Sequence, residues 1–212
     1  MNILQVIYSL SQGGAERFVV NLSNELAEKG HRVTLGTFRD DETDPKMSFN
    51  RQFLNKKVRY VNLKISPGFS LEKINRIENL VKDTRPDIIH CHDWQTGLMP
   101  VYLKNEFWDS SSYSDFYQNM KAVMTIHNLK FQGTWNIDDM MRVTGLPGYL
   151  FTSDKLEAYG AGNYLKGGLV YADWITTVSG VYANEIKYPF YGEGLDGLMR
   201  ARSNNLSGIV NG

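Results

Sequence analysis

Short apolar runs along the chain alternate with segments whose apolar residues recur at helical spacing. Residues 3–8 form a short, mainly apolar run, which predicts a buried parallel strand. From residue 15 to 29 the apolar side chains recur at helical spacing, and Gly30 suits the end of a helix. Residues 32–38 predict a second strand. This order of strand, glycine loop, helix and strand is typical of the first βαβ unit of a doubly wound sheet.

The same alternation continues through the rest of the chain. Further strands are expected at 58–63, 87–92, 121–126, 174–178 and 206–210, and helices at 71–83, 96–104, 153–159, 163–172, 181–187 and after a loop at 191–197. A loop with a short helix is expected at 40–57, an exposed excursion at 108–117 and a less regular stretch at 127–149. The predicted fold class is therefore α/β, with a Rossmann-like, doubly wound, mainly parallel sheet in one domain over residues 1–212.

Composition excludes several classes of partner. The 23 basic and 23 acidic side chains cancel, so no field of one sign favours nucleic acid or an anionic membrane. Cys91 is the one cysteine, which indicates a cytoplasmic, reducing setting. The N-terminus does not resemble a signal peptide, and no apolar run has the length of a membrane span. The chain stops directly after a predicted strand, and we expect it to be part of a longer protein.

Three polar or glycine-rich loops follow predicted strands: residues 9–14, 90–94 and 127–128. In open α/β sheets, ligands bind beyond the carboxyl ends of the strands, so these loops are expected at one binding rim. Gly13 and Gly14 precede a helix, where free N–H groups favour an anionic ligand, although a plain tight turn has about equal weight. No dinucleotide fingerprint or Walker loop accompanies them.

The polar residues of the other two loops each have two interpretations. His90 and His92 point to one side of a strand and Cys91 to the other, which disfavours a metal site. Asp93 suits hydrogen bonding to a sugar hydroxyl, or it caps the helix that starts near Thr96. His127 is suited to exchanging a proton or a hydrogen bond with a ligand, and a structural role is at least as well supported by the residues alone.

The second part of the chain resembles glycogen and starch synthases, which are two-domain retaining glycosyltransferases of the GT-B type. Residues 125–133 are similar to the family's His-Asn-Leu-x-(Tyr/Phe)-Gln-Gly segment. The likeness includes His92-Asp93-Trp94 and extends over segments at 163–173, 176–179, 191–197 and 206–212. It covers roughly residues 93–212.

The first 92 residues are similar to a different branch of the superfamily. Gly13-Gly14-Ala15-Glu16-Arg17 resembles the Gly-Gly-Ala-Glu-Arg glycosyltransferases that build surface polysaccharides. Glycogen synthases have Lys-x-Gly-Gly in this loop, where the lysine attends the donor phosphates, and this chain has Ser11-Gln12-Gly13-Gly14. Either the lineage has a mixed character or the chain is a splice of two sources near His92.

The resemblance implies retaining transfer of glucose from ADP-glucose or UDP-glucose to the 4-hydroxyl of an α-1,4-glucan, without a metal or other cofactor. His127 would be the catalytic residue, contacting the transferred sugar near its reacting carbon. The resemblance further implies substrate contacts by Gly13 and Gly14 at the phosphates, and by Asp93, Trp94, Asn128, Gln132 and Asp196 at the sugars. A second domain, absent here, would hold most of the nucleotide, and the exposed face that it leaves would favour self-association.

The first hypothesis for the function of the chain is the acceptor-side domain of a glucan synthase, and the sequence leaves two alternatives to it. One is a fragment of a surface-polysaccharide transferase, favoured by the first 92 residues. The other is a folded, non-catalytic scaffold or glucan-binding module.

Overall fold

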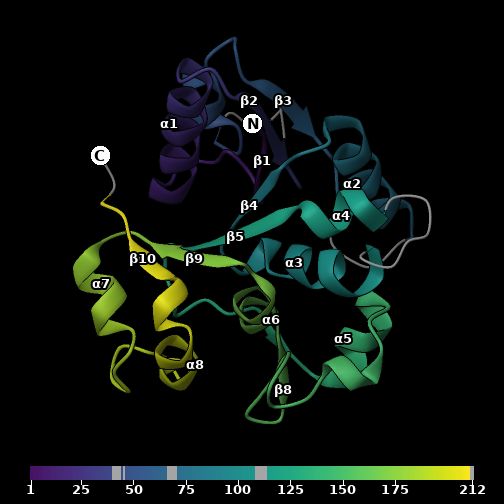
Figure 1. Cartoon of the computed structure of the whole chain (residues 1–212), viewed down its shortest axis with the longest axis vertical. Coiled ribbons are helices and arrows are strands. Elements are labelled where there is room, and N and C mark those ends of the chain that lie inside the picture. The colour runs from purple at the N-terminus through teal and green to yellow at the C-terminus, as the bar shows by residue number, and fades with distance from the viewer. Residues whose placement is uncertain (40–43, 45, 66–70, 108–113, 211–212) are drawn as a thin grey trace. The chain divides into compact units, whose positions relative to one another are not determined.

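The computed structural model describes residues 1–39, 44, 46–65, 71–107 and 114–210 (Figure 1). The chain divides into two compact units, Met1–His90 and Cys91–Gly212, and each is described by itself. Parts of the expected loop at 40–57, of the expected excursion at 108–117 and of the last motif at 211–212 lie outside the described residues. The organisation as one domain over 1–212 stays a prediction.

Parallel strands form the sheet of the first unit. They are β1 (Asn2–Ile7), β2 (Arg32–Thr37) and β3 (Arg59–Asn62), with β2 between the other two. The unit also contains α1 (Gly14–Glu28), the 3-10 turn Phe49–Phe53 and α2 (Leu71–Thr84). β4 (Ile88–His92) begins in this unit and carries the chain into the second. These elements confirm the predicted strands and helices of this region, with ends that differ by a residue or two.

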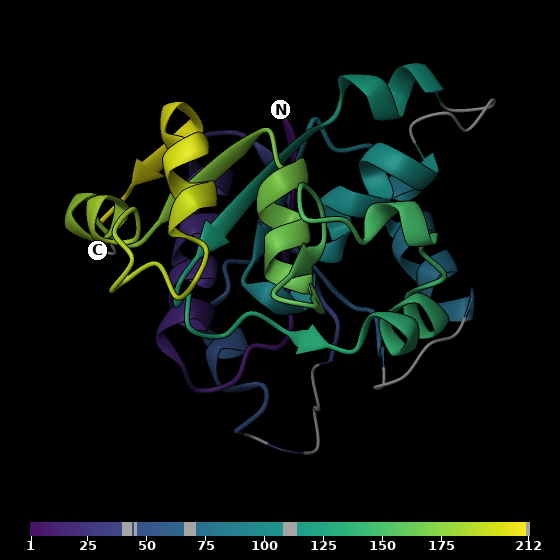
Figure 2. The ribbon, with the colours of Figure 1, turned by 90° about the horizontal axis from the view of Figure 1, so that it is seen from below.

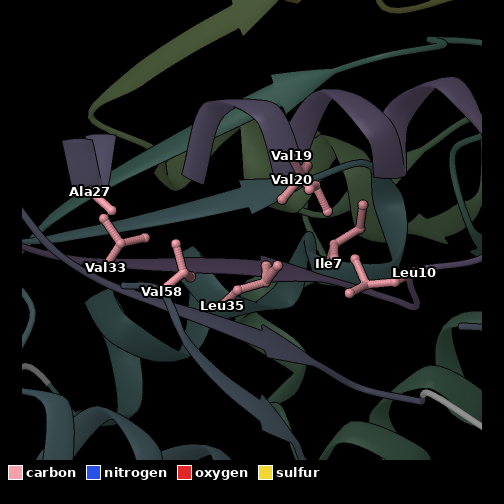
Figure 3. Close-up of a cluster of buried hydrophobic side chains, with 8 residues drawn as sticks. All are labelled: Ile7, Leu10, Val19, Val20, Ala27, Val33, Leu35 and Val58. Atoms are coloured by element: carbon pink, nitrogen blue, oxygen red, sulfur yellow. The ribbon is translucent and has the colours of Figure 1, made fainter. Parts of the chain in front are cut away.

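The core of the first unit lies between α1 and the strands. Val19 and Val20 of α1 face Ile7 of β1 and Leu35 of β2, and all four side chains are buried (Figure 3). A fully buried side chain of this size stabilises the fold by about 1.5–3 kcal/mol. Gly30 follows α1 with φ of +87°, a conformation that favours glycine, so the helix ends where the sequence predicts.

Parallel strands also form the main sheet of the second unit. They are β5 (Lys121–Ile126), β9 (Trp174–Thr177) and β10 (Leu206–Gly208), with β9 in the middle. A small antiparallel sheet consists of β6 (Thr134–Trp135), β8 (Ala161–Asn163) and β7 (Glu157–Ala158). Parallel strands connected through helices confirm the predicted Rossmann-like α/β class, and the small antiparallel sheet is an addition to it.

Six short α-helices accompany these strands in the described part of the second unit. They are α3 (Leu98–Tyr102), α4 (Ser114–Asn119), α5 (Ile137–Thr144), α6 (Tyr164–Tyr171), α7 (Gly180–Glu185) and α8 (Asp196–Ala201). Three 3-10 turns are described, at Trp94–Thr96, Gly148–Leu150 and Ser203–Asn205. A π-helical turn follows α3 at Leu103–Phe107. α6 packs against α3 and β5, and α7 packs against β9 and β10 (Figure 2).

The expectation of an exposed excursion at 108–117 is wrong for its last residues. Residues from Ser114 onward form α4, and the ring of Tyr117 is fully buried. Serine and aspartate in the segment favour exposure, but one face of the short helix turns inward and places Tyr117 beside buried Met120.

The stretch at 127–149 is more regular than expected, because it contains α5. The Asn136 side chain accepts the backbone N–H groups of Asp138 and Asp139, which caps the start of the helix. Gly145, with φ of +73°, ends it.

The helix predicted at 153–159 is also wrong. Lys166, which is 9% exposed, donates from Nζ to the backbone carbonyls of Ser153 and Glu157. These carbonyls accept hydrogen bonds from the buried lysine, which is a tertiary contact, instead of forming the hydrogen bonds of a helix. The segment therefore forms a turn that leads into β7. Within the described residues, no helix is both long and apolar enough to cross a membrane.

Arg202 secures the end of α6, and its removal provides a test of the second unit. Its guanidinium donates to the carbonyls of Leu169, Val170 and Ala172 at 2.7–2.8 Å. These are acceptors that the end of a helix leaves without partners inside the helix. Hydrogen bonds from a charged group contribute about 1.5–3 kcal/mol. We therefore expect Arg202→Ala to lower the free energy of unfolding by about 2–3 kcal/mol in urea titrations.

The matched control is Arg142→Ala, which removes an exposed ion pair with Asp139 on α5. Exposed pairs contribute about 0–1 kcal/mol, so this variant is expected to remain near the wild type. Equal losses for the two variants would contradict the role given to Arg202.

Candidate active site

The end of β4 turns sharply at Asp93. Its φ of +57° lies in the left-handed region that few residues other than glycine adopt. The backbone N–H of Asp93 donates to the carbonyl of Thr125 in β5. The Thr96 hydroxyl reaches back to the carbonyls of His92 and Asp93, at 2.9 and 3.1 Å. These bonds hold the strained turn in place and direct the Asp93 side chain toward the end of β5.

The Asp93 carboxylate joins the ends of the two strands. Its Oδ1 accepts the backbone N–H of His127 at 2.8 Å. Asp93 therefore does not cap the following turn with its side chain, as one interpretation of the sequence had it. A charge-assisted bond of this kind is shorter and stronger than a neutral one. It fixes His127 at the carboxyl end of β5, as expected.

The ring of His127 contacts a second histidine. Its Nε2 lies 3.1 Å from Nδ1 of His92, and the two ring centroids are 5.4 Å apart. His92 is 1% exposed. Burial lowers the pKa of His127 from 6.5 to about 4, so the ring is neutral at pH 7. A neutral imidazole donates from one nitrogen and accepts at the other.

Trp94 belongs to a group of three aromatic rings. Its ring centroid lies 5.5 Å from that of Trp135 and 6.3 Å from that of Tyr164. A Cβ atom at Gly133 would lie 2.3 Å from the Trp94 ring, and Gly133 has φ of +64°. Glycine is thus required at this position for two reasons. Trp135 is 48% exposed, so the group presents an aromatic edge to solvent.

Gln132 connects three segments of the second unit. Its Nε2 donates to the carbonyls of Leu129 and Glu193, and its Oε1 accepts from the side-chain amide of Asn163 at 2.6 Å. The amide thereby ties the loop after β5 to the loop at 191–197 and to the start of α6. Contact of Gln132 with a substrate stays a prediction, and the observed bonds give it a positioning role.

Asn128 and Asp196 also make contacts within the chain. Asn128 is exposed, and its Oδ1 accepts the backbone N–H of Lys130 at 3.0 Å. Asp196 begins α8, and its Oδ2 pairs with Arg200 at 2.6 Å. The loop that precedes α8 is held further by Tyr159, whose hydroxyl donates to the carbonyl of Gly194 at 3.0 Å.

Gly13 and Gly14 lie in the first unit, at the start of α1. A Cβ atom at Gly13 would lie 2.2 Å from the Glu16 carboxylate, so the glycine makes room for that side chain. The Ser11 hydroxyl donates to Glu16 at 3.0 Å. A carboxylate in the first turn of a helix interacts favourably with the helix dipole. Glu16 thus supplies negative charge at the position where the sequence predicts an anionic ligand, and the phosphate contact stays a prediction.

The predicted residues of the second unit include two that are bonded to each other, Asp93 and His127, and one that bonds the loop before α8, Gln132. Asp93 and His127 form the junction of β4 and β5, and Gln132 extends it toward the loop that carries Asp196. His92 and Tyr159 were not among the predicted site residues. His92 could have been found from its position directly before Asp93, whereas the bond of Tyr159 to a loop 35 residues away leaves no local signal. Among the described residues, no cluster of three or more His, Cys, Asp or Glu side chains suits a metal ion.

Sequence comparison identifies two glycosyltransferase profiles along the chain. Residues 69–201 match the family described as starch synthase catalytic domain. Residues 6–107 match a profile described as glycosyl transferase 4-like. One match thus covers most of the first part of the chain and the other most of the second part, in agreement with the two resemblances described for these parts of the sequence.

Curated relatives include glycogen synthases. That of Lachnospira eligens is 70% identical over 128 residues, which are 60% of this chain and 26% of the relative. That of Thermotoga maritima is 48% identical over 136 residues, 63% of this chain and 27% of the relative. The chain therefore spans about a quarter of the length of these relatives.

Among solved structures, the catalytic domain of starch synthase IV from Arabidopsis thaliana, solved bound to ADP and acarbose, matches with a TM-score of 0.74. The match covers 100% of this chain and 52% of that one at 21% identity, which shows the fold. The match to the starch synthase catalytic domain, over residues 69–201, covers more than half of this chain. The chain therefore belongs to the starch synthase catalytic domain family.

Proposed function

We propose that this chain is the N-terminal, acceptor-side part of a retaining glucosyltransferase of the glycogen or starch synthase type. It would take part in extending an α-1,4-glucan from a nucleotide-glucose donor. The observation that carries the proposal is the junction in which Asp93 holds the backbone of His127 at the carboxyl end of β5. The family membership and the 70% identity to a glycogen synthase support the assignment of glucose and glucan.

In the proposed reaction, the bond between C1 of glucose and the donor diphosphate breaks, and the diphosphate leaves with the electron pair. A bond forms between C1 and the acceptor 4-hydroxyl oxygen, whose proton passes to an oxygen of the leaving diphosphate. Positive charge develops near C1, so a neutral His127 beside the sugar avoids charge repulsion there. Asp93 and Asn128 would bind sugar hydroxyls, and Trp94 would stack on a sugar ring. Gln132 and Asp196 would hold the surrounding loops.

The donor phosphates would meet Gly13 and Gly14. That loop carries the Glu16 carboxylate and has no lysine at Ser11 or Gln12. Compensation of the diphosphate charge would therefore fall to residues of a second domain. Either ADP-glucose or UDP-glucose fits this proposal, and the ADP found with the Arabidopsis enzyme supports the former. No metal or other cofactor is proposed, and a cytoplasmic location stays a prediction.

A second candidate function is transfer in the assembly of a surface polysaccharide. The observation that favours it is the glycosyl transferase 4-like match over residues 6–107. The two candidates differ in acceptor. A panel of maltooligosaccharides and non-glucan oligosaccharides, titrated against Trp fluorescence, separates them: selective binding of maltooligosaccharides supports the first.

The direct test of the proposed function is a segment exchange. The 128 residues that match the Lachnospira eligens glycogen synthase would replace their counterpart in that enzyme. We expect the exchanged enzyme to keep glucan synthesis, and His127→Ala to lower its kcat by about 100-fold or more, as loss of one electrostatic group at a reacting centre does. Incorporation of labelled glucose into glycogen measures both.

The control in the same enzyme is Arg142→Ala, whose side chain is 75% exposed on α5. It is expected to retain activity. A His127→Ala enzyme as active as this control would show that His127 is not at the reacting centre.

The 212-residue chain alone is expected not to transfer glucose at a useful rate. Most of the length of its relatives has no counterpart in it. Positioning of two substrates in a closed cleft contributes about 7–11 kcal/mol to lowering a barrier, and an isolated half forgoes it. The assay combines the chain, ADP-glucose or UDP-glucose and a maltooligosaccharide. Steady chain extension in proportion to protein concentration would contradict the expectation.

The lowered pKa of His127 predicts a pH-dependent stability. Between pH 6.5 and 4 the unfolded chain binds a proton at this ring, whereas the folded chain does not. Stability is therefore lost as the pH falls through this window, by up to about 3 kcal/mol at 1.36 kcal/mol per pKa unit. His127→Gln lacks this contribution. The His92 ring and the Asp93 carboxylate face the same residue and remain in both proteins.

The measurement is the free energy of unfolding of wild type and His127→Gln at pH 7, 6, 5 and 4. The difference between them is expected to move against the wild type by about 1–3 kcal/mol from pH 7 to 4. Val181→Ala, which shortens an exposed side chain that has no titrating group, is the control and should run parallel to the wild type. Parallel curves for His127→Gln as well would refute the prediction.

A further inference from the structure

His92 is a buried polar ring that the proposed function does not use. It is 1% exposed, at the end of β4. Buried polar groups are stable when they are hydrogen-bonded. Its Nδ1 lies 3.1 Å from Nε2 of His127, within the range of a hydrogen bond between nitrogens.

The backbone around this contact is fixed on both sides. The Thr96 hydroxyl bonds the carbonyls of His92 and Asp93, and Asp93 holds the backbone N–H of His127. The two rings therefore meet because both strand ends are held, and not through free rotation of an exposed side chain. A contact made this way has one geometry and constrains the rotation of the His127 ring.

The contact also constrains the protons. One proton lies between Nδ1 of His92 and Nε2 of His127, because two would repel and none would leave facing lone pairs. If His92 donates from Nδ1, then neutral His127 carries its proton on Nδ1. If His127 donates from Nε2, then neutral His92 carries its proton on Nε2. In either case both rings have the same tautomer, and the hydrogen-bonding character of His127 Nδ1 is set by His92.

We infer that His92 is a positioning residue, which fixes the ring orientation and the tautomer of His127 toward the transferred sugar. The inference rests on the proposed function for the identity of the sugar. After transfer, that glucose is the terminal residue of the product glucan. A maltooligosaccharide bound as product would therefore present it to His127, which makes maltopentaose a suitable probe for the isolated chain.

Nitrogen-15 NMR of the histidine-labelled chain at pH 7 tests the constraint directly. The chain has four histidines, so each ring can be assigned with one substitution. We expect His92 and His127 to show one tautomer each, the same for both, and a scalar coupling across the N–H···N bond. Opposite tautomers, or a mixture at His127, would overturn the inference. Matched tautomers follow from the contact itself, so the effect of the variants on maltopentaose binding is what separates positioning from a purely structural role.

Two variants extend the test to binding. In His92→Asn, the amide atoms stand as many bonds from the backbone as Nδ1 and can still bond His127. In His92→Leu, no polar atom remains. We expect His92→Leu to change the tautomer ratio of His127 and to weaken maltopentaose binding about tenfold, and His92→Asn to stay within about threefold of the wild type. His31→Asn is the control for removal of a histidine.

The outcomes separate the inference from the proposed function. Wild-type affinity in a folded His92→Leu chain, or an unchanged tautomer of His127 in it, would overturn the positioning role. If the wild type binds no maltopentaose, the proposed function is contradicted, and the tautomers of the two rings alone then support or overturn the role of His92. If His92→Leu does not fold, the wild-type coupling and the His92→Asn variant still decide.

Discussion

The second unit depends on one hydrogen bond, from the backbone N–H of His127 to the carboxylate of Asp93. It joins the ends of β4 and β5 after their ladder has ended, where no regular backbone bond would hold them. The strained φ of Asp93 is tolerated because its own N–H, its carbonyl and its carboxylate are all bonded. This bond fixes the start of the loop that follows β5, and the Tyr182 hydroxyl holds the loop two residues later by accepting the backbone N–H of Leu129.

After β5 the arrangement extends outward through Gln132 and Tyr159, which bond to backbone carbonyls, and through the bond between the Gln132 and Asn163 side chains. Gln132 binds the carbonyls of Leu129 and Glu193, and Tyr159 binds the carbonyl of Gly194. Backbone acceptors are present whatever the residue type, so such contacts set the path of a loop without fixing its side chains. The loop at 191–197 is held through the main-chain carbonyls of Glu193 and Gly194, and the side chain of Asp196 pairs with Arg200.

Much of the fold followed from the sequence because strands and helices have local periodicities. The strand at 121–126 and the helix that ends before Gly30 are examples, and so is the position of His127 at a strand end. The errors arose where tertiary contacts override local pattern. Residues 153–159 form turns because Lys166, in a later helix, binds two of their carbonyls. The His92–His127 contact spans 35 residues, so no local periodicity predicts it, although the position of His92 directly before Asp93 marks the residue as a candidate.

The division of the chain into two units also organises its chemistry. The boundary falls inside β4, after His90, within residues 69–107, where the two glycosyltransferase matches overlap. The ladder of a strand is made by backbone groups that every residue except proline supplies, so it is compatible with side chains of either type. Asp93 and His127, which we propose contact the transferred sugar, belong to one unit, and the Gly13-Gly14 loop with its Glu16 carboxylate belongs to the other. Under the proposed function, the contacts to the transferred glucose and the contacts to the donor phosphates would therefore come from separate units of the chain.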